Sequence, residues 1–401
     1  MSADAAVVAA HVEAEEPRYG WVVVWATFVA LAVIFGVAYS FAAFFEPFVG
    51  EFKAQRADVS LVFGLCGLVY FVLGAFGGML SDRLGPRVVV GAGMVCIAAG
   101  LLGAGVARTM TEVTLAYGVG VGLGIALVYT PAIGTVQPWF TRRRGLAAGI
   151  ASAGIGAGTL IVPLLAATAI AAWRWRGAMT ALAIGTLAIG LSAALLLRRA
   201  PAAARRSDGT VPGTPLKAAL TSRTFLWLYA MCGFGAFGMF IPFAHLSAAA
   251  RDLGVPDARA VGLVGLIGIG SLTGRFAIGA LADRVGRPGT LILAQASLGA
   301  SFIVWALADG YLALAAFALW MGTSYGGIVS LMPALCMDRF GARAVSSIIA
   351  ALYSAAAIGN LAGPWLAGRI FDATASYAAV TWGCLAMSAL STLCTWAAVR
   401  R

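Results

Sequence analysis

Apolar runs of about 20 residues recur along the whole chain, and they constrain its fold more than any other feature. A helix needs a run of that length to cross a hydrocarbon layer about 30 Å thick. Hydrophobic residues make up 61% of the 401 residues and charged residues 11%, whereas soluble domains carry about 25% charged residues. The strands of a membrane barrel would alternate over about 10 residues, and these runs do not alternate. The sequence therefore predicts an all-α membrane protein.

Charged turns divide the chain into twelve predicted transmembrane helices. These are expected near residues 20–45, 60–80, 88–107, 113–137, 145–170, 177–197, 224–248, 260–282, 290–308, 311–336, 345–368 and 377–398. The stretch 199–223 is the only long polar linker. It predicts a tail over 1–18, an N-terminal six-helix bundle over 19–198, the linker over 199–223 and a C-terminal six-helix bundle over 224–401.

The distribution of basic residues predicts the orientation in the membrane. Of the 27 Lys and Arg residues, eighteen fall on one side, eight on the other, and Arg275 within a span. The positive-inside rule places the richer side, with both termini and the linker, in the cytoplasm. No Lys or Arg precedes Arg18, which is unlike a signal peptide, so we expect the tail to be retained.

The two halves of the chain repeat one another at a constant offset of 201 residues. The offset relates Gly78, Asp82, Arg83 and Gly85 to Gly279, Asp283, Arg284 and Gly286, and likewise Arg142 to Arg343, Gly158 to Gly359 and Pro163 to Pro364. Such a repeat predicts two pseudo-symmetric bundles related by an axis along the membrane normal, with a binding site between them.

The duplicated pattern G-x-x-x-D-R-x-G resembles the signature between spans two and three of the major facilitator superfamily. Ordinary topogenic turns would explain its arginines but not the repeated Gly and Asp spacing. A glycine lets helices approach closely, and the aspartate can meet a helix N-terminus or an arginine and hold a gate shut. The resemblance implies a cytoplasmic gate formed by Gly78, Asp82, Arg83, Arg87, Gly279, Asp283 and Arg284.

A narrower resemblance covers the stretch W-F-T-R-R-R-G-L-A-A-G-I-A-S-A-G-I-G over residues 139–156. It is similar to the opening of span five in monocarboxylate transporters and in the related oxalate:formate antiporters. The stretch Y-G-W-V-V over residues 19–23 resembles the start of their span one, and Arg275 lies where that family carries its substrate-binding arginine. The resemblance implies a bacterial-type member in the cytoplasmic (inner) membrane, a secondary transporter that takes a short monocarboxylate such as lactate or pyruvate by proton symport. No cofactor is implied.

Arg275 is the candidate that carries most of this hypothesis. Counted along a helix, it lies about 12 Å above Asp283, well inside the hydrocarbon layer. A guanidinium at that depth costs several kcal/mol unless an anion meets it. The alternative is a structural ion pair, but Asp283 is two turns away, and no other span holds an Asp or Glu at this depth. We therefore expect Arg275 to bind the substrate carboxylate.

Three tyrosines are expected at the same depth. Counted from the cytoplasmic ends of their spans, Tyr129, Tyr353 and Tyr325 lie about 13, 15 and 20 Å deep. A tyrosine offers an apolar face and one hydroxyl, which suits a small organic anion, although each could equally serve packing between helices. Asn360 and Ser271 are further candidates for the substrate site, but small polar residues often serve helix packing.

The chain departs from the animal members of the resembled family at its titratable positions. Ser271 stands where proton-coupled members have an aspartate, and the first span offers no ionisable residue other than Tyr39. His245 is then a candidate for proton coupling, with a plain polar role at the interface as the alternative. The oxalate antiporter uses a second cation in span eleven, whereas residues 346–368 contain no Lys or Arg. A single cation suits one carboxylate, but an anion exchanger of the oxalate:formate kind remains the alternative.

Other classes of function find little support in the sequence. The six cysteines lie within apolar runs without metal-ligand spacing, and no basic soluble face for nucleic acid is present. A membrane enzyme would need a nucleophile with its base at the membrane face, and a sensor would add a soluble output domain. The expected partners are a monocarboxylate anion, a proton and the lipid bilayer, with a monomer as the transport unit.

Overall fold

The computed structural model describes residues 17–140, 143–200, 213–341 and 343–400, and for Arg144, Asp283 and Ser346 only the backbone. Over these residues all regular secondary structure is helical, apart from one isolated bridge between Gly213 and Gly341. Eleven of the helical segments are long and apolar enough to cross a membrane. One of them, Leu146–Leu196, holds two spans, because the backbone leaves helical geometry at Trp173 and at Arg174, where φ is 57°. The prediction of an all-α protein with twelve transmembrane helices is confirmed.

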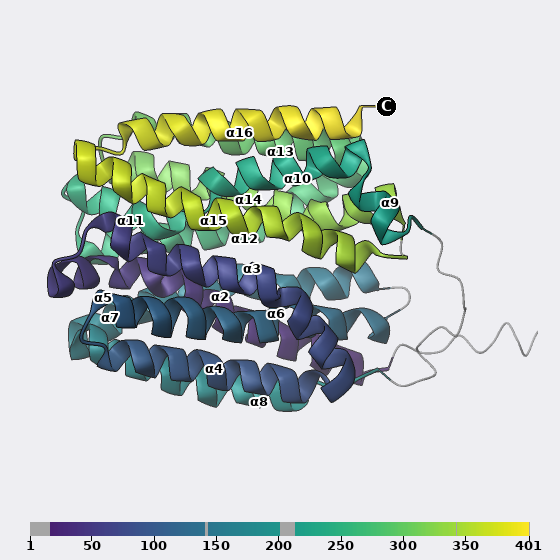
Figure 1. The fold of residues 1–401 in the computed structure, drawn as a ribbon, viewed down its shortest axis with the longest axis horizontal. Coiled ribbons are helices and arrows are strands. Elements are labelled where there is room, and N and C mark those ends of the chain that lie inside the picture. Colours follow the sequence, from purple (N-terminus) through teal and green to yellow (C-terminus); the bar gives the residue numbers. More distant parts are fainter. Residues whose placement is uncertain (1–16, 141–142, 201–212, 342, 401) are drawn as a thin grey trace, which may run out of the picture.

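The first half of the chain forms the lower group of helices in Figure 1. Its elements are α2 (Tyr19–Phe52), α3 (Arg56–Leu84), α4 (Pro86–Val106), α5 (Met110–Val113), η1 (Thr114–Val121), α6 (Gly122–Val136), η2 (Gln137–Trp139), α7 (Arg144–Gly185), η3 (Thr186–Gly190) and α8 (Leu191–Leu196). The segments η1 and η3 are π-helical and η2 is a 3₁₀ turn. We call this group the N half.

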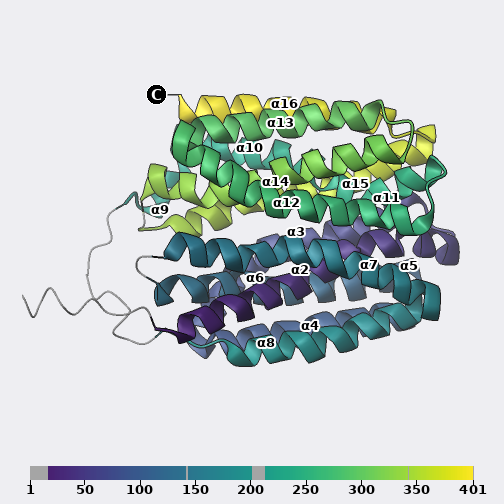
Figure 2. The same cartoon turned by 180° about the vertical axis from the view of Figure 1, so that it is seen from behind.

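The second half forms the upper group, which we call the C half. Its elements are α9 (Leu216–Leu220), α10 (Arg223–Met239), α11 (Ile241–Asp252), α12 (Asp257–Val285), α13 (Arg287–Ala306), α14 (Tyr311–Phe340), α15 (Val345–Thr374) and α16 (Ala378–Val399). The view from behind shows the same two groups lying side by side (Figure 2). We call the end at which α2 ends and α3 begins the outer end, and the end that carries α9 the inner end.

The halves meet mainly through α3 against α15 and α7 against α12. Glycines permit the close approach in both pairs. A Cβ at Gly268 would lie 2.8 Å from the carbonyl oxygen of Gly156, and a Cβ at Gly368 would lie 2.5 Å from Cα of Ala57. Neither position has room for a side chain, so these glycines set how tightly the halves close.

The duplicated motif ends two corresponding helices in the same way. Gly85 follows α3 with φ 92°, and Gly286 follows α12 with φ 95°. Only glycine adopts such values without strain. Each glycine therefore stops its helix and lets the next one start within a residue or two, which produces the same tight turn in both halves.

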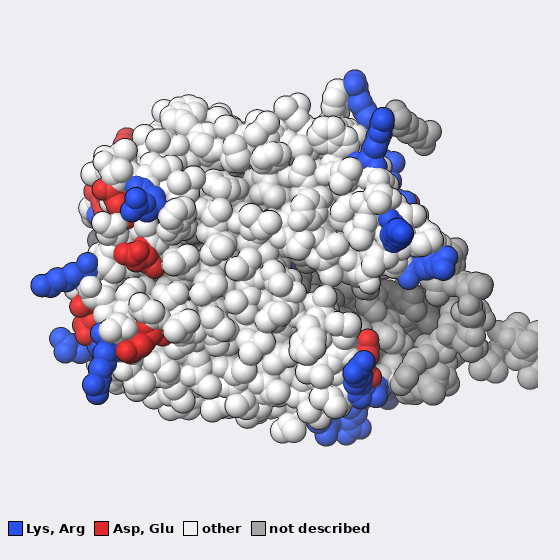
Figure 3. Space-filling view, viewed as in Figure 1, with Lys and Arg blue, Asp and Glu red and all other residues white. Residues whose placement is uncertain are grey.

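The surface of the molecule matches a bilayer. Figure 3 shows a broad uncharged belt with the charged side chains gathered at the two ends. Large apolar side chains in the middle of helices, such as Val95 (52% exposed) and Ile161 (51% exposed), remain on that surface, as expected of helices whose solvent there is lipid. Figure 3 also shows the surface hollowed between the halves towards the inner end.

Candidate functional site

A cavity lies between the two halves and holds about 710 Å³ of space, its open mouth included. Helices of both halves contribute to its wall. The lining residues are Phe35, Tyr70, Phe71, Tyr129 and Ile155 from the N half, and Met231, Cys232, Gly235, Ala236, Met239, Phe240, Gln295, Tyr325, Ile328, Val329, Met332, Tyr353 and Ala356 from the C half.

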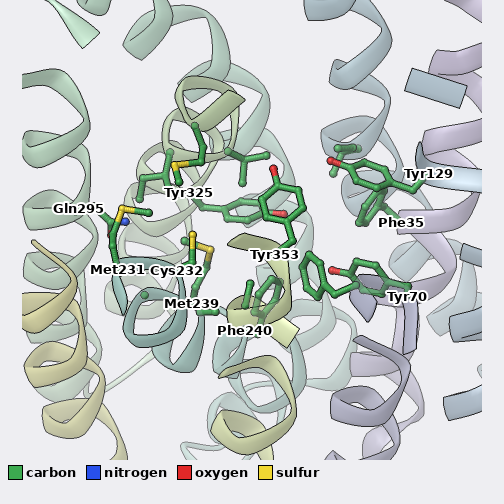
Figure 4. A pocket seen from close by; sticks show the side chains of 18 residues that line it. Phe35, Tyr70, Tyr129, Met231, Cys232, Met239, Phe240, Gln295, Tyr325 and Tyr353 are labelled. Carbon is green, nitrogen blue, oxygen red and sulfur yellow. The ribbon is translucent and has the colours of Figure 1, made fainter. Parts of the chain in front are cut away.

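The structure brings the three predicted tyrosines to this one cavity (Figure 4). Tyr129 comes from α6 of the N half, and Tyr325 and Tyr353 come from α14 and α15 of the C half. The hydroxyl of Tyr325 lies 3.1 Å from that of Tyr39 on α2, so a hydrogen bond joins the halves here. The Tyr39 ring is in turn stacked on Phe243 at 4.1 Å between centroids. Hydroxyl groups thus face an otherwise apolar cavity from both sides.

Arg275 on α12 is buried, with 7% of its surface exposed. Its Nε and one of its terminal nitrogens, Nη2, have no hydrogen-bond partner, and within the described residues no carboxylate pairs with it. The side chain is not among those that line the cavity. Its helix nevertheless packs closely against α14, because Gly326, next to the lining residue Tyr325, lies against the carbonyl of Ser271, one turn before Arg275. The structure therefore places an unpaired cation beside the tyrosine wall.

Ser271 and Asn360, the two other candidates for substrate binding, lie in different surroundings. Ser271 is one turn before Arg275 on α12, is 1% exposed, and its hydroxyl has no partner. Asn360 on α15 donates its amide to the carbonyl of Gly64 at 3.2 Å and fills the space that a side chain at Gly67 would need. Ser271 thus adds a second unpartnered group next to Arg275, whereas the Asn360 amide is engaged in packing between the halves. The substrate role of each stays a prediction.

Among the lining residues that the sequence analysis did not single out, Tyr70 and Gln295 each carried a signal. Tyr70 lies near the middle of the 29-residue helix α3, so the depth count that selected the other tyrosines would also select it. Gln295 lies in the middle of α13. Together with Asn360 it is one of two carboxamides deep within a predicted span. A polar amide at that depth needs a partner, which marks it as a candidate.

A polar network closes the outer end between the halves. Arg56 at the start of α3 donates to the hydroxyl of Tyr377 at 3.0 Å, and its guanidinium lies 3.9 Å from the ring centroid of Phe371. The carboxylate of Asp372 accepts hydrogen bonds from the backbone N–H groups of Arg56 and Ala57, each at 3.0 Å. These contacts join the first turn of α3 in the N half to the end of α15 in the C half.

His245, the candidate for proton coupling, belongs to this outer network and does not line the cavity. It is fully buried in α11. Its Nδ1 lies 3.0 Å from the hydroxyl of Tyr377, and its Nε2 lies 2.8 Å from the carbonyl oxygen of Pro364. Burial raises the pKa of the Tyr377 phenol above its ordinary value, so this hydroxyl keeps its proton and can donate it to Nδ1. Nε2 then donates to the carbonyl. Both nitrogens are thus bonded when the imidazole is neutral.

The residues expected to form the cytoplasmic gate lie at the inner end. Asp82, Arg83 and Arg87 are exposed around the turn between α3 and α4, and Arg284 is exposed at the corresponding turn between α12 and α13. Gly78 lies against Thr130 and Gly279 has open space around it. The side chain of Asp283 lies outside the described part of the structure. No ion pair is found for Asp82 among the described residues, and the gating role of this set stays a prediction.

Comparison with known proteins identifies the family. The family model described as Major Facilitator Superfamily matches residues 26–364. Monocarboxylate transporter 13 of Bos taurus is 30% identical over 374 residues, which cover 93% of this chain and 87% of that protein. Monocarboxylate transporter 3 of Rattus norvegicus is 31% identical, with 90% and 75% covered.

Solved structures support the fold. A bacterial homologue of the human lysosomal transporter Spinster, in an inward-facing and unoccupied conformation, superposes with a TM-score of 0.72 at 18% identity, with 95% of this chain and 98% of that chain covered. A peptide transporter in complex with alafosfalin gives a TM-score of 0.70 at 15% identity, with 92% and 93% covered. The chain belongs to the Major Facilitator Superfamily and, within it, to the family of the monocarboxylate transporters.

Proposed function

We propose that this protein carries a short monocarboxylate such as lactate or pyruvate, together with a proton, across the cytoplasmic membrane of a bacterium by alternating access. The unpartnered guanidinium of Arg275 is the observation that carries the proposal. A buried charge without a partner is costly unless a ligand of opposite charge completes the site. A carboxylate is the anion that matches the planar donor pair of an arginine.

The tyrosines around Arg275 give the site its remaining polar contacts. The hydroxyls of Tyr129 and Tyr325 can donate to the second carboxylate oxygen, while their rings cover the organic part of the substrate. Tyr353 adds a third hydroxyl on the same wall. A monocarboxylate leaves no charge uncompensated in such a site, because one cation meets one anion.

The arrangement of the halves supports a transport cycle. The outer end is held shut by the Arg56 network, while the surface is hollowed towards the inner end. With the orientation predicted from the basic residues, this conformation is open to the cytoplasm. Substrate binding neutralises Arg275, which lowers the cost of closing the cavity and lets the halves rock about the bound anion.

Uptake into proteoliposomes tests the proposal. The purified protein is assayed with radiolabelled lactate, pyruvate, oxalate and formate, with and without an imposed pH gradient. We expect lactate or pyruvate to accumulate when the outside is acidic, and Arg275→Ala to abolish this uptake. Arg259→Ala is the matched control, because Arg259 is an exposed arginine on the same helix α12.

Two outcomes would contradict the proposal. Uptake by Arg275→Ala at the rate of the unmodified protein would remove the carboxylate-binding role of Arg275. Counterflow of oxalate or formate that does not respond to pH would favour an organic anion exchanger of the oxalate:formate kind over proton symport.

A further inference from the structure

One polar side chain lines the cavity far from Tyr129 and has an unpartnered atom. Gln295 of α13 lines the cavity but is only 1% exposed, and its side-chain oxygen Oε1 has no hydrogen-bond partner. Figure 4 shows Gln295 at one end of the cavity and Tyr129 at the other, with Tyr325 and Tyr353 between them. A buried carboxamide oxygen without a partner is unfavourable, so this atom is available to accept a hydrogen bond from a ligand in the cavity.

The neighbours of Gln295 leave its amide free. Ser391 of α16, which lies close by, donates its hydroxyl to the carbonyl of Met231 at 3.0 Å. Gly235 of α10 keeps the approach open, because a Cβ there would lie 2.9 Å from the Ser391 hydroxyl and 3.6 Å from Nε2 of Gln295. Ser388 on α16 also has a free hydroxyl, but it does not line the cavity. The amide therefore lies at the cavity wall next to Gly235, where no side chain covers it.

The wall between the two polar ends is apolar and partly sulfur-containing. It includes Met231, Cys232, Met239, Phe240 and Met332. Thioether side chains make favourable contacts with aromatic rings and adapt to their shape. The lining thus suits an aromatic skeleton between an anionic group at the Tyr129 end and a neutral polar group at the Gln295 end.

We propose that Gln295 selects substrates that carry a hydroxyl group at the end opposite their carboxylate, so that the site takes hydroxyaryl monocarboxylates as well as short acids. This inference rests on the proposed function, because it needs the carboxylate to lie near Arg275. A carboxamide offers one acceptor and one donor group side by side. A hydroxyl group matches it, since it donates to Oε1 and can accept from Nε2.

Direct binding to the purified protein tests the inference with two probes that differ by one hydroxyl. These are radiolabelled 3-(4-hydroxyphenyl)propionate and 3-phenylpropionate. We expect the unmodified protein to bind the hydroxylated acid about fivefold more tightly, as one neutral hydrogen bond allows. Gln295→Met has a side chain of similar length without the amide, and we expect this variant to bind the two acids with about equal affinity. Because the readout is a ratio within one variant, a general loss of affinity does not imitate this result.

The outcomes separate this inference from the proposed function. An unmodified protein without preference, or a preference that persists in Gln295→Met, overturns the role of Gln295. If neither aromatic acid binds while lactate uptake remains sensitive to Arg275→Ala, the inference fails and the proposed function stands. If both acids bind to Arg275→Ala as tightly as to the unmodified protein, Arg275 does not bind the carboxylate, and the proposed function fails as well.

Discussion

Arg56 of the N half and Asp252 of the C half form a two-point ion pair at the outer end. Nη1 of Arg56 lies 2.7 Å from Oδ2 of Asp252, and Nη2 lies 2.7 Å from Oδ1. The arginine side chain is 12% exposed and the aspartate side chain 37% exposed. Parallel bonds between an arginine and a carboxylate are stronger and more directional than single ones. This pair is therefore well placed to stabilise the closed outer end.

Removing the pair should open the outer end. We expect Arg56→Met to shift the equilibrium between the closed and open outer end by roughly tenfold, since a charged hydrogen bond contributes about 1.5–3 kcal/mol. Spin labels at Lys53 and Arg259, one in each half at this end, would report the change as a longer distance in pulsed electron resonance.

A matched variant controls for loss of an ion pair in general. Arg176→Met breaks the Arg176–Glu51 pair, whose nitrogen and oxygen lie 2.6 Å apart, but both partners belong to the N half. It should leave the distance between the halves unchanged. If the two variants gave the same distances, the Arg56 pair would have no gating role.

A side chain at Gly368 should act in the same direction through sterics. A Cβ there would lie 2.5 Å from Cα of Ala57, which is a backbone atom that cannot move aside. We expect Gly368→Leu to prevent closure of the outer end and to lower uptake at least tenfold while the protein still reaches the membrane. Gly383→Leu is the control, since a Cβ at Gly383 meets nothing within 4 Å. Normal uptake by Gly368→Leu would show that α3 and α15 need not approach this closely during transport.

The hydroxyl of Tyr325 should contribute to affinity through its bond to Tyr39 and its position beside Arg275. We expect Tyr325→Phe to raise the apparent KM for the carboxylate about fivefold, because about 1 kcal/mol is lost with one hydrogen bond. Tyr117→Phe is the control. Its buried hydroxyl donates to the carbonyl of Val37 at 2.8 Å, away from the cavity. An equal rise of KM in both variants would indicate a general packing effect.

Much of the fold could be predicted because the bilayer imposes strict requirements on length and hydropathy. The turn between spans five and six was placed between residues 170 and 177, and the structure leaves helical geometry at Trp173 and Arg174. Depth along a helix was also predictable, so that Tyr129, Tyr325 and Tyr353 were expected at one level, and they line one cavity.

The direction in which a side chain points could not be predicted in the same way. The spans are apolar on all sides, so no polar face reveals which residues point inward. Asn360 was a candidate for the substrate site with helix packing as the alternative, and the sequence could not show that its amide bonds to Gly64 in the interface between the halves. Gln295 was passed over, although its side chain lines the cavity. Packing between distant segments decides such orientations, and a single sequence does not contain it.

Protonation of His245 should weaken the outer network. A doubly protonated imidazole would present an N–H to the Tyr377 hydroxyl, which itself donates to Nδ1 in the neutral state. The new charge would also face Arg56, with the carboxylate of Asp372 as the opposing charge nearby. Acid on the outside is therefore expected to favour opening, because the closed state holds the neutral imidazole. This is the direction in which a proton-driven importer must respond.

Replacement of His245 tests the coupling. We expect His245→Gln to abolish accumulation driven by a pH gradient, while counterflow of unlabelled against labelled substrate persists. Uptake should be compared with and without an imposed pH gradient that is acidic outside. If the variant still accumulated substrate under a pH gradient, the proton would have to travel by another route, such as the substrate itself.

The buried, unpaired charge of Arg275 should lower the stability of the protein when no substrate is bound. A structural arginine held by an ion pair would lower the melting temperature when replaced, since breaking a buried pair leaves an uncompensated charge. Arg275 instead has unpartnered nitrogens at 7% exposure. We therefore expect Arg275→Met to raise the melting temperature of the purified protein by a few degrees while it abolishes uptake.

Substrate binding should provide a second test of the role of Arg275, because a ligand that binds only the folded state stabilises it. Saturating carboxylate should raise the melting temperature of the unmodified protein. At a concentration one hundredfold above the dissociation constant, binding adds about 2.7 kcal/mol to the free energy of unfolding. The same addition should leave Arg275→Met unchanged. A lower melting temperature for Arg275→Met would mean that the guanidinium is paired within the protein, and the site would then lack the free cation on which carboxylate recognition depends.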